Sequence, residues 1–203
     1  MADHYYTTSP DSKSDIRMIP YEVNGRKYEF YTDHGVFSIS RVDHGTDILI
    51  NTVLEDYTAI PGSEAGILDM GCGYGPVGIV MADQYADTQV VMLDVNERAM
   101  DLAQKSAVLN RVADHVSIVK EEQLEDMRFQ MVVTNPPIRA GKQTIYHLFA
   151  LAEEKLISGG ALYVVIRKNQ GADSAVKELK RLFGNCETIE KKSGFHILRS
   201  IKE

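Results

Sequence analysis

The chain has 203 residues, of which 44% are hydrophobic and 25% are charged, with 15 glycines and 6 prolines. This composition is typical of a soluble globular protein, and it excludes disordered, collagen-like and disulfide-stapled small proteins. Two cysteines, and an N-terminus with neither a basic n-region nor an apolar h-region, predict a cytoplasmic protein with reduced thiols. The longest apolar stretches are the size of strands, far below the ~20 residues that a membrane-spanning helix needs, which excludes a membrane span.

The net charge of −7 is distributed unevenly along the chain. Residues 1–135 hold 10 basic and 22 acidic side chains, whereas residues 136–203 hold 12 basic and 7 acidic ones. The molecule as a whole would repel a polyphosphate. An anionic partner is therefore expected to bind the C-terminal third.

The first 34 residues are polar and rich in tyrosine, which is typical of a cap on a larger body. Short alternating stretches at 27–31 and 36–39 predict a small antiparallel β lead-in. Apolar residues then recur at helical spacing over 47–54. These patterns divide the chain into an N-terminal cap over 1–45 and a main domain over 46–203.

From residue 65 onward, strand-like runs alternate with helical ones, the pattern of a doubly wound α/β sheet. The predicted strands are 66–70, 89–94, 116–119, 131–134, 161–166, 186–189 and 195–201, and the predicted helices are 77–85, 97–109, 143–157 and 172–183. Because a short loop joins the last two strands, we expect them to form an antiparallel hairpin. The predicted fold is thus a Rossmann-like α/β sheet of seven strands, mostly parallel, with an antiparallel C-terminal hairpin.

A glycine-rich loop follows the first of these strands. Gly71, Gly73 and Gly75 occupy alternate positions, and Pro76 then starts a helix. Glycine suits a sharp turn that a ligand approaches closely, and the free N–H groups of a helix start favour polar or anionic groups. The spacing from Gly73 also satisfies the dinucleotide pattern G-x-G-x-x-G. Asp69, however, would repel a pyrophosphate, and it suits a ligand that carries an ammonium and a sulfonium group.

A second acidic residue, Asp94, ends the next strand, 23 residues after Gly71. At this position a carboxylate accepts hydrogen bonds from both ribose hydroxyls of an adenosine. The position fits NAD and S-adenosylmethionine equally well. Asn96 is suited to cap the helix that begins at Glu97, and for Asn96 a purely structural role is an equal alternative.

The strand at 131–134 ends in Asn135-Pro136-Pro137, an unusual way to leave a sheet. Two consecutive prolines donate no N–H and hold the chain extended, so the result is a rigid corner rich in carbonyl groups. The amide oxygen of Asn135 and the carbonyl of Pro136 can both accept from one exocyclic NH₂ group. Holding those two protons directs the nitrogen lone pair at an electrophile, which is catalysis by positioning rather than by a strong base.

The sequence resembles the S-adenosylmethionine-dependent methyltransferases of the Rossmann-like class, in the branch that methylates amines. The resemblance rests on the glycine loop with Asp69, on Asp94 and on the Asn135-Pro136-Pro137 corner. Within this branch the sequence is similar to the bacterial 16S ribosomal RNA guanine-N2 methyltransferase family and its small single-domain relatives. The matching segments at 4–6, 36–38, 43–46 and 135–142 spread the resemblance over nearly the whole chain. The resemblance implies an enzyme that methylates an exocyclic nucleobase amine, with S-adenosylmethionine as cofactor and ribosomal RNA or a ribosomal subunit as partner.

The resemblance also implies a role for individual residues. The catalytic corner that binds the target amine would consist of Asn135, Pro136 and Pro137. The cofactor would be bound by acidic strand ends, the glycine loop, a segment that closes its methionine end and an adenine contact, namely Asp69, Gly71, Gly73, Gly75, Asp94, Val95, Asp43, Gly45, Thr46 and Glu121. The substrate would contact the residue after the corner and a rim of basic side chains that follow strand ends and grip phosphates, namely Ile138, Arg139, Lys142, Arg167 and Lys168.

Three positions depart from the family's pattern. Ile138 stands where an aromatic residue usually stacks on the target base, and it has no π-face. The segment 120–124 lacks the usual Asp or Asn that contacts the adenine amino group, so Glu121 or Glu122 is expected to replace it, with a solvated acidic loop as the alternative. Gln130 stands where an Asp commonly precedes the strand, which predicts an altered adenine pocket.

Other functions remain compatible with parts of the pattern. The same corner would serve a methyltransferase for adenine N6 or for a protein glutamine; Ile138 favours glutamine, whereas the basic C-terminal segment favours RNA. A non-catalytic RNA-binding assembly module and an NAD-dependent oxidoreductase are further alternatives. The six histidines show no metal-ligand spacing, so no metal is expected, and the sequence leaves the oligomeric state and the modified nucleotide open.

Overall fold

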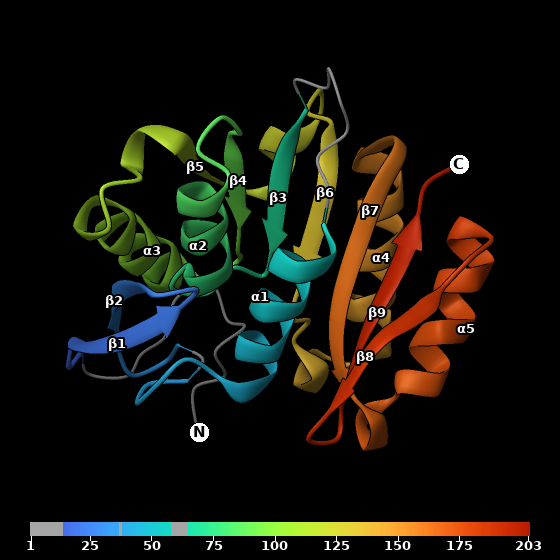
Figure 1. Cartoon of the computed structure of the whole chain (residues 1–203), viewed down its shortest axis with the longest axis horizontal. Coiled ribbons are helices and arrows are strands. Elements are labelled where there is room, and N and C mark those ends of the chain that lie inside the picture. The colour runs from blue at the N-terminus through green and yellow to red at the C-terminus, as the bar shows by residue number, and fades with distance from the viewer. Residues whose placement is uncertain (1–13, 37, 58–64) are drawn as a thin grey trace.

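Seven strands form the central sheet of the computed structural model, which describes residues 14–36, 38–57 and 65–203 (Figure 1). The strands are β3 (Gly66–Met70), β4 (Val90–Leu93), β5 (Val116–Val119), β6 (Phe129–Thr134), β7 (Leu156–Arg167), β8 (Glu187–Lys192) and β9 (Phe195–Ile201), in the order β5-β4-β3-β6-β7-β9-β8. Strand β9 is antiparallel to both β7 and β8, and the other neighbours pair in parallel. The mostly parallel sheet and its antiparallel C-terminal hairpin are therefore confirmed.

Helices cover both faces of this sheet (Figure 1). One face packs against α1 (His44–Asp56), α2 (Pro76–Gln84) and α3 (Glu97–Leu109), and the other packs against α4 (Lys142–Lys155) and α5 (Ala172–Phe183). Successive strand residues therefore enter different cores: Ile67 of β3 belongs to the α1 side and Leu68 to the α4 side. Burial on both faces explains why the inner strands β3, β4 and β6 are mostly apolar.

The chain leaves β3 toward α2 on one face and leaves the neighbouring strand β6 toward α4 on the other. In doubly wound sheets, such a reversal opens a crevice at the carboxyl ends of the two strands, where ligands bind. The glycine loop follows β3 and the Asn135-Pro136-Pro137 corner follows β6. The topology thus places the two segments that the sequence singled out on either side of one crevice.

The N-terminal lead-in is a separate hairpin of β1 (Arg17–Val23) and β2 (Arg26–Thr32). Its turn is Asn24-Gly25, with φ of 50° and 71°, as a two-residue hairpin turn requires. The expectation that 36–39 supplies the second strand was wrong, because residues 17–23 pair with β2 and residues 36, 38 and 39 lie in no strand; residue 37 lies outside the described residues. The hairpin packs on α3, where the backbone N–H of Tyr31 donates to Ser106 Oγ at 3.0 Å.

The remaining predicted elements differ from the structure mainly at their ends. Strand β8 runs to Lys192 rather than ending at 189, and β7 begins at Leu156 rather than at 161. The turn between β8 and β9 consists of Ser193 and Gly194, which have φ of 50° and 78°. Across the described part of the chain, no helix has the length and hydropathy to span a bilayer.

Candidate active site

A cavity of about 490 Å³ lies at the crevice between the carboxyl ends of β3, β4 and β6. Its walls come from the glycine loop, the two acidic strand ends, the proline corner, α1 to α4 and the segments after β2 and β5. The lining residues are Val36, Thr46, Asp69, Gly71, Cys72, Gly73, Tyr74, Pro76, Val77, Leu93, Asp94, Val95, Ala99, Glu121, Asn135, Pro136, Pro137, Ala140, Thr144 and Leu148. Of the sequence-predicted site residues, Asp69, Gly71, Gly73, Asp94, Val95, Thr46, Glu121, Asn135, Pro136 and Pro137 therefore line one cavity.

The glycine loop leaves open space on the cavity side. Gly71 and Gly73 have φ of 73° and 58°, and a Cβ at either position would meet no heavy atom within 4 Å. The backbone N–H groups of Gly71 and Cys72 donate to the carbonyl of Leu93 at 2.8 and 3.0 Å, which fixes the loop to the end of β4. A ligand can therefore approach this backbone without any side chain in between.

Gly75, in contrast, is a packing residue and does not line the cavity. It caps the start of α2 with φ of 89°, and a Cβ there would lie 3.0 Å from Ile79 Cδ1 and 3.3 Å from the Cβ of Ala103. The sequence pattern does not separate the two roles, because a ligand-facing glycine and a closely packed one are the same residue type at the same spacing.

Asp69 is the buried carboxylate at the end of β3 and is only 2% exposed. Its Oδ2 accepts from the backbone N–H of Gly78 at 2.8 Å, within α2. Burial raises the pKa of Asp69 to about 7; the Gly78 N–H opposes this rise, and the nearby charge of Asp94 adds to it. At neutral pH, Asp69 thus divides between the neutral and ionised forms, and a cationic ligand would favour the ionised one.

Asp94 joins the glycine loop to the end of β4. Its Oδ2 accepts from the backbone N–H of Gly73 at 2.8 Å and its Oδ1 from that of Asn96 at 2.9 Å. Burial raises the pKa of Asp94 despite these N–H donors. Each oxygen keeps a second lone pair for a hydroxyl donor. The adjacent Val95 is 55% exposed and adds an apolar surface to the same wall.

Asn96 acts as the N-cap of α3, as expected. Its Oδ1 accepts from the backbone N–H of Ala99 at 3.1 Å, and its Nδ2 donates to the carbonyl of Gly35 at 3.0 Å. Asn96 is fully buried and does not line the cavity. It ties the segment after the N-terminal hairpin to α3, so its role here is structural.

Asn135 is fixed by a contact that sequence reasoning did not predict. Its Nδ2 donates to Thr46 Oγ1 at 2.9 Å, across 89 positions of sequence, and Thr46 is only 5% exposed. No described residue donates a hydrogen bond to the amide oxygen of Asn135, so this oxygen can accept one from a ligand. Thr134 secures the strand just before it, because its Oγ1 donates to the carbonyl of Met70 at 2.8 Å.

Asp43 and Gly45 lie outside the cavity lining and shape the helix start that presents Thr46. Asp43 is the N-cap of α1, and its Oδ2 accepts from the backbone N–H groups of Gly45 at 2.9 Å and Thr46 at 3.3 Å. A Cβ on Gly45 would lie 2.6 Å from Cε1 of Phe195, so glycine lets β9 approach α1. The contribution of this segment to the site is therefore the position of Thr46.

Glu121 lines the far wall of the cavity and is held by a residue that the sequence analysis missed. Nε2 of His147, on α4, lies 2.8 Å from Oε1 of Glu121. No spacing rule links the two residues, because they come together only when α4 packs beside the loop after β5. Gln130, which was expected to alter the adenine pocket, does not line the cavity: it is the second residue of β6, near the end of the strand away from Asn135, and its Nε2 donates to the carbonyl of Ala65 at 2.6 Å.

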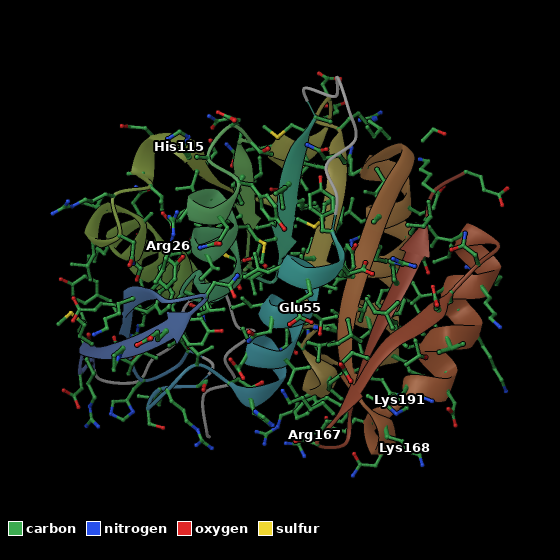
Figure 2. All side chains as sticks on the ribbon, viewed as in Figure 1. Arg26, Glu55, His115, Arg167, Lys168 and Lys191 are labelled. Atoms are coloured by element: carbon green, nitrogen blue, oxygen red, sulfur yellow. The ribbon has the colours of Figure 1, made fainter. Side chains whose placement is uncertain are left out.

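The predicted substrate contacts lie outside the cavity. Ile138 is half-buried and packs against the core on the α4 side. Arg139 and Lys142 are exposed at the start of α4. Arg167 and Lys168 are exposed where β7 ends, at the lower edge in Figure 2.

The chemistry of the site follows from this arrangement. One half combines a buried carboxylate, Asp69, and a half-buried one, Asp94, with a bare glycine backbone, which suits a ligand that carries a cationic group and hydroxyls. The other half offers the amide oxygen of Asn135 beside the carbonyl of Pro136, two acceptors for a primary amine. A single cavity thus contains a place for a charged cofactor and a place for an amine.

Comparisons with known proteins agree with this geometry. The methyltransferase small domain family matches residues 27–199 of the chain. Uncharacterized protein YbxB of Bacillus subtilis (strain 168) is 37% identical over 206 residues, with 100% of each chain covered. Ribosomal RNA large subunit methyltransferase G of Shewanella denitrificans is 30% identical and matches 94% of this chain, and ribosomal RNA small subunit methyltransferase C of Stutzerimonas stutzeri is 28% identical and matches 83%. The matched region spans 50% and 49%, respectively, of those two relatives.

Solved structures share the fold. A T. Thermophilus 16S rRNA N2 G1207 methyltransferase in complex with AdoMet and guanosine aligns with a TM-score of 0.78 at 24% identity, covering 96% of this chain and 52% of that one. A methyltransferase from Pyrococcus furiosus aligns with a TM-score of 0.61 at 21% identity, covering 77% and 80%. Because the family matches most of its length, the chain belongs to the methyltransferase small domain family of S-adenosylmethionine-dependent methyltransferases.

Proposed function

We propose that this methyltransferase transfers a methyl group to an exocyclic nucleobase amine, guanine N2 of small-subunit ribosomal RNA. The observation that carries the proposal is the orientation of the Asn135 amide. Its NH₂ group donates to Thr46, and its oxygen, next to Pro136, accepts from no described residue. The names of the ribosomal RNA methyltransferases that the chain resembles support the choice of substrate.

The cofactor half of the cavity fits S-adenosylmethionine. Gly71 and Gly73 leave the space that its methionine portion would fill, Asp69 would attract its ammonium group, and Asp94 would accept from its ribose. Val95 and Glu121 would flank its adenine. When bound, this cofactor supplies an electrophilic methyl group on a sulfonium.

The residues of the corner position the amine. The Asn135 amide oxygen and the Pro136 carbonyl would each accept a hydrogen bond from one N–H of the target NH₂, and Pro137 keeps the chain extended beyond them. In guanine the N2 lone pair is delocalised into the ring, so two acceptors that pull the protons to one side favour the pyramidal, attacking form. The developing ammonium is acidic and loses its proton to water, so no dedicated base is required.

The surroundings of the corner bear on the alternatives. Ile138 has no aromatic ring on which a base could stack, and a protein glutamine would not need one. The exposed cations Arg139, Lys142, Arg167 and Lys168 instead suit a phosphate backbone. A base buried in structured RNA would also have to be exposed before it reached the cavity. Membership of the methyltransferase family sets aside the NAD-dependent oxidoreductase.

The direct test is to incubate the protein and labelled S-adenosylmethionine with unmodified 16S ribosomal RNA, with small ribosomal subunits and with a ribosome-free protein extract. Nucleosides and amino acids are then separated by mass spectrometry. N2-methylguanosine in the RNA supports the proposal. N6-methyladenosine or methylglutamine would replace it with one of the alternatives, and label in none of the fractions would favour the non-catalytic module.

Replacing Thr46 tests how Asn135 is oriented. Thr46→Val removes the hydroxyl acceptor of the half-buried Asn135 NH₂ group, a hydrogen bond that contributes about 0.5–1.5 kcal/mol, and frees the amide to turn. We expect kcat for RNA methylation to fall by about 10- to 100-fold, whereas Thr46→Ser, which keeps the acceptor, retains most of it. Steady-state kinetics measures methyl transfer, and calorimetry with S-adenosylmethionine measures cofactor binding. An intact kcat with weakened cofactor binding would assign Thr46 to the cofactor instead.

The pH dependence of stability tests Asp69. The folded pKa of about 7 lies above the ordinary value of 3.8, so between these pH values the folded state binds more protons than the unfolded one. The free energy of unfolding should therefore decrease as the pH rises from about 4 to 7, and this part of the decrease should be absent in Asp69→Asn. Denaturant unfolding at pH 5 and pH 8 measures it. Parallel pH profiles for the two proteins would contradict the assignment.

A further inference from the structure

Four cations gather at the tip of the C-terminal hairpin, and two of them were not among the residues that the sequence singled out. Arg167 ends β7 and Lys168 directly follows it, and Lys191 and Lys192 end β8; all four are exposed. Figure 2 shows Arg167, Lys168 and Lys191 together at the lower edge of the molecule. We refer to Arg167, Lys168, Lys191 and Lys192 as the cationic ridge.

Strand register fixes the spacing of two ridge residues, Arg167 and Lys192. Arg167 and Lys192 both pair with Phe195 of β9, from opposite sides, so these three residues point to the same face of the sheet. Since neighbouring strands are about 4.8 Å apart, the backbones of Arg167 and Lys192 lie about 10 Å apart. The backbone N–H of Lys168 donates to the carbonyl of Gly194 at 2.9 Å, which ties the end of β7 to the hairpin turn.

The cations of the ridge have no carboxylate partner among the described residues. Arg181, Arg199 and Lys202, in the same part of the chain, are each paired with an acid. Arg167 instead lies over the ring of Phe195, with its guanidinium carbon 4.4 Å from the ring centroid. The nearest acid in sequence, Glu190, accepts from the backbone N–H of Lys191 at 2.6 Å. The ridge therefore presents cations that are free to bind an anion.

A short chain of contacts joins the ridge to the proposed amine-binding corner. Phe195, under Arg167, approaches Gly45 so closely that a Cβ there would lie 2.6 Å from its Cε1. The next residue, Thr46, accepts the hydrogen bond from Asn135. The ridge thus stands beside the wall of the cavity where the target amine would bind, on the side away from the cofactor loop.

We propose that the cationic ridge binds the sugar-phosphate backbone of the substrate RNA next to the nucleotide that enters the cavity. This inference rests on the proposed function and adds Lys191 and Lys192 to the substrate surface. A polyanion is favoured over a protein or membrane partner because the large hydrophobic side chains exposed among the described residues, Ile16, Met18, Val95 and Val108, all lie outside the ridge. Lysines that grip phosphates strengthen binding without reading sequence.

The test is the double variant Lys191→Gln/Lys192→Gln, with Lys177→Gln/Lys180→Gln as the matched control. The control lysines are also exposed but lie on α5, and the charge change is the same. Binding of unmodified 16S ribosomal RNA is measured from 50 to 300 mM KCl, together with the steady-state kinetics of methylation and the melting temperature. The ridge variant should bind RNA about tenfold more weakly at low salt, with a salt slope smaller by about 0.7 for each lost phosphate contact.

The KM for RNA should rise in the ridge variant with kcat and cofactor affinity unchanged, whereas the control variant should match the wild type. An equal loss of RNA affinity in both variants, or no loss in the ridge variant, would overturn the proposal. Binding to anionic vesicles is measured as well, and a ridge variant that binds RNA normally but vesicles more weakly would also overturn it. If the wild type methylates no RNA but the ridge variant still loses RNA affinity, the proposed function is wrong, whereas the role of the ridge in RNA binding is supported.

Discussion

Replacing Asn135 by alanine is expected to lower methyl transfer by about 10²–10³-fold, the effect of removing one preorganised hydrogen-bonding group from an active site. The amide oxygen is one of two acceptors in the proline corner, and the Pro136 carbonyl alone cannot fix both protons of an amine. Affinity for S-adenosylmethionine should stay at the wild-type value, because Asn135 is not one of the residues proposed to bind the cofactor. Single-turnover methylation and calorimetry measure the two quantities separately.

The matched control for Asn135→Ala is Gln104→Ala, which removes an exposed amide on α3. The control should methylate RNA at the wild-type rate. Asn135→Asp is a second informative variant, since it keeps the shape but cannot donate to Thr46 and adds a charge. Wild-type turnover in Asn135→Ala would remove the corner from the mechanism, whatever the result for cofactor binding.

Replacing Asp94 by asparagine is expected to weaken S-adenosylmethionine binding by about 100-fold or more. The carboxylate accepts from the N–H groups of Gly73 and Asn96 at the same time, and an amide of the same shape must turn its own NH₂ toward one of them. A hydrogen bond to a charged group contributes about 1.5–3 kcal/mol, so loss of one loop contact and one ribose contact accounts for this change. Calorimetric titration with the cofactor measures the affinity.

The control for Asp94→Asn is Asp101→Asn, which removes the same charge from an exposed position on α3. Cofactor affinity should be normal in that variant. The melting temperature of Asp94→Asn without cofactor distinguishes a loosened loop from an unfolded protein. Wild-type affinity in Asp94→Asn would exclude Asp94 from the cofactor site.

The sheet was predictable because its signals are local. The inner strands of the sheet are mostly apolar runs, and the glycines and prolines that follow β3 and β6 stand within a few residues of the strand, as in the segment from Gly66 to Pro76. The pairing of β2 was not predictable in this way, since residues 36–39 alternate as β1 does. The Asn24-Gly25 turn was the signal that favours β1, and it outweighs the alternation because it sets the backbone twist of a hairpin.

The site was predictable as a set of segments, and much less so as a set of contacts. Residues in the strand-end motifs, such as Asp69 and Asn135, line the cavity. The contacts that orient them come from elsewhere in the chain: Thr46 reaches Asn135, and His147 reaches Glu121. Such pairs depend on how helices dock on the sheet, which no spacing in the sequence encodes.

The hydrogen bonds that shape the two halves of the cavity close very different lengths of chain. Those that hold the glycine loop, from Gly78 to Asp69 and from Gly73 to Asp94, span 9 and 21 positions, whereas the bond between Thr46 and Asn135 spans 89. The entropic cost of closing a loop rises with the number of residues in it. Docking of α1 next to Asn135 therefore costs more entropy than ordering the glycine loop. If α1 is not docked on the sheet, the glycine loop and the two carboxylates would still be in place. Such a molecule would bind the methyl donor, S-adenosylmethionine, but could not transfer its methyl group.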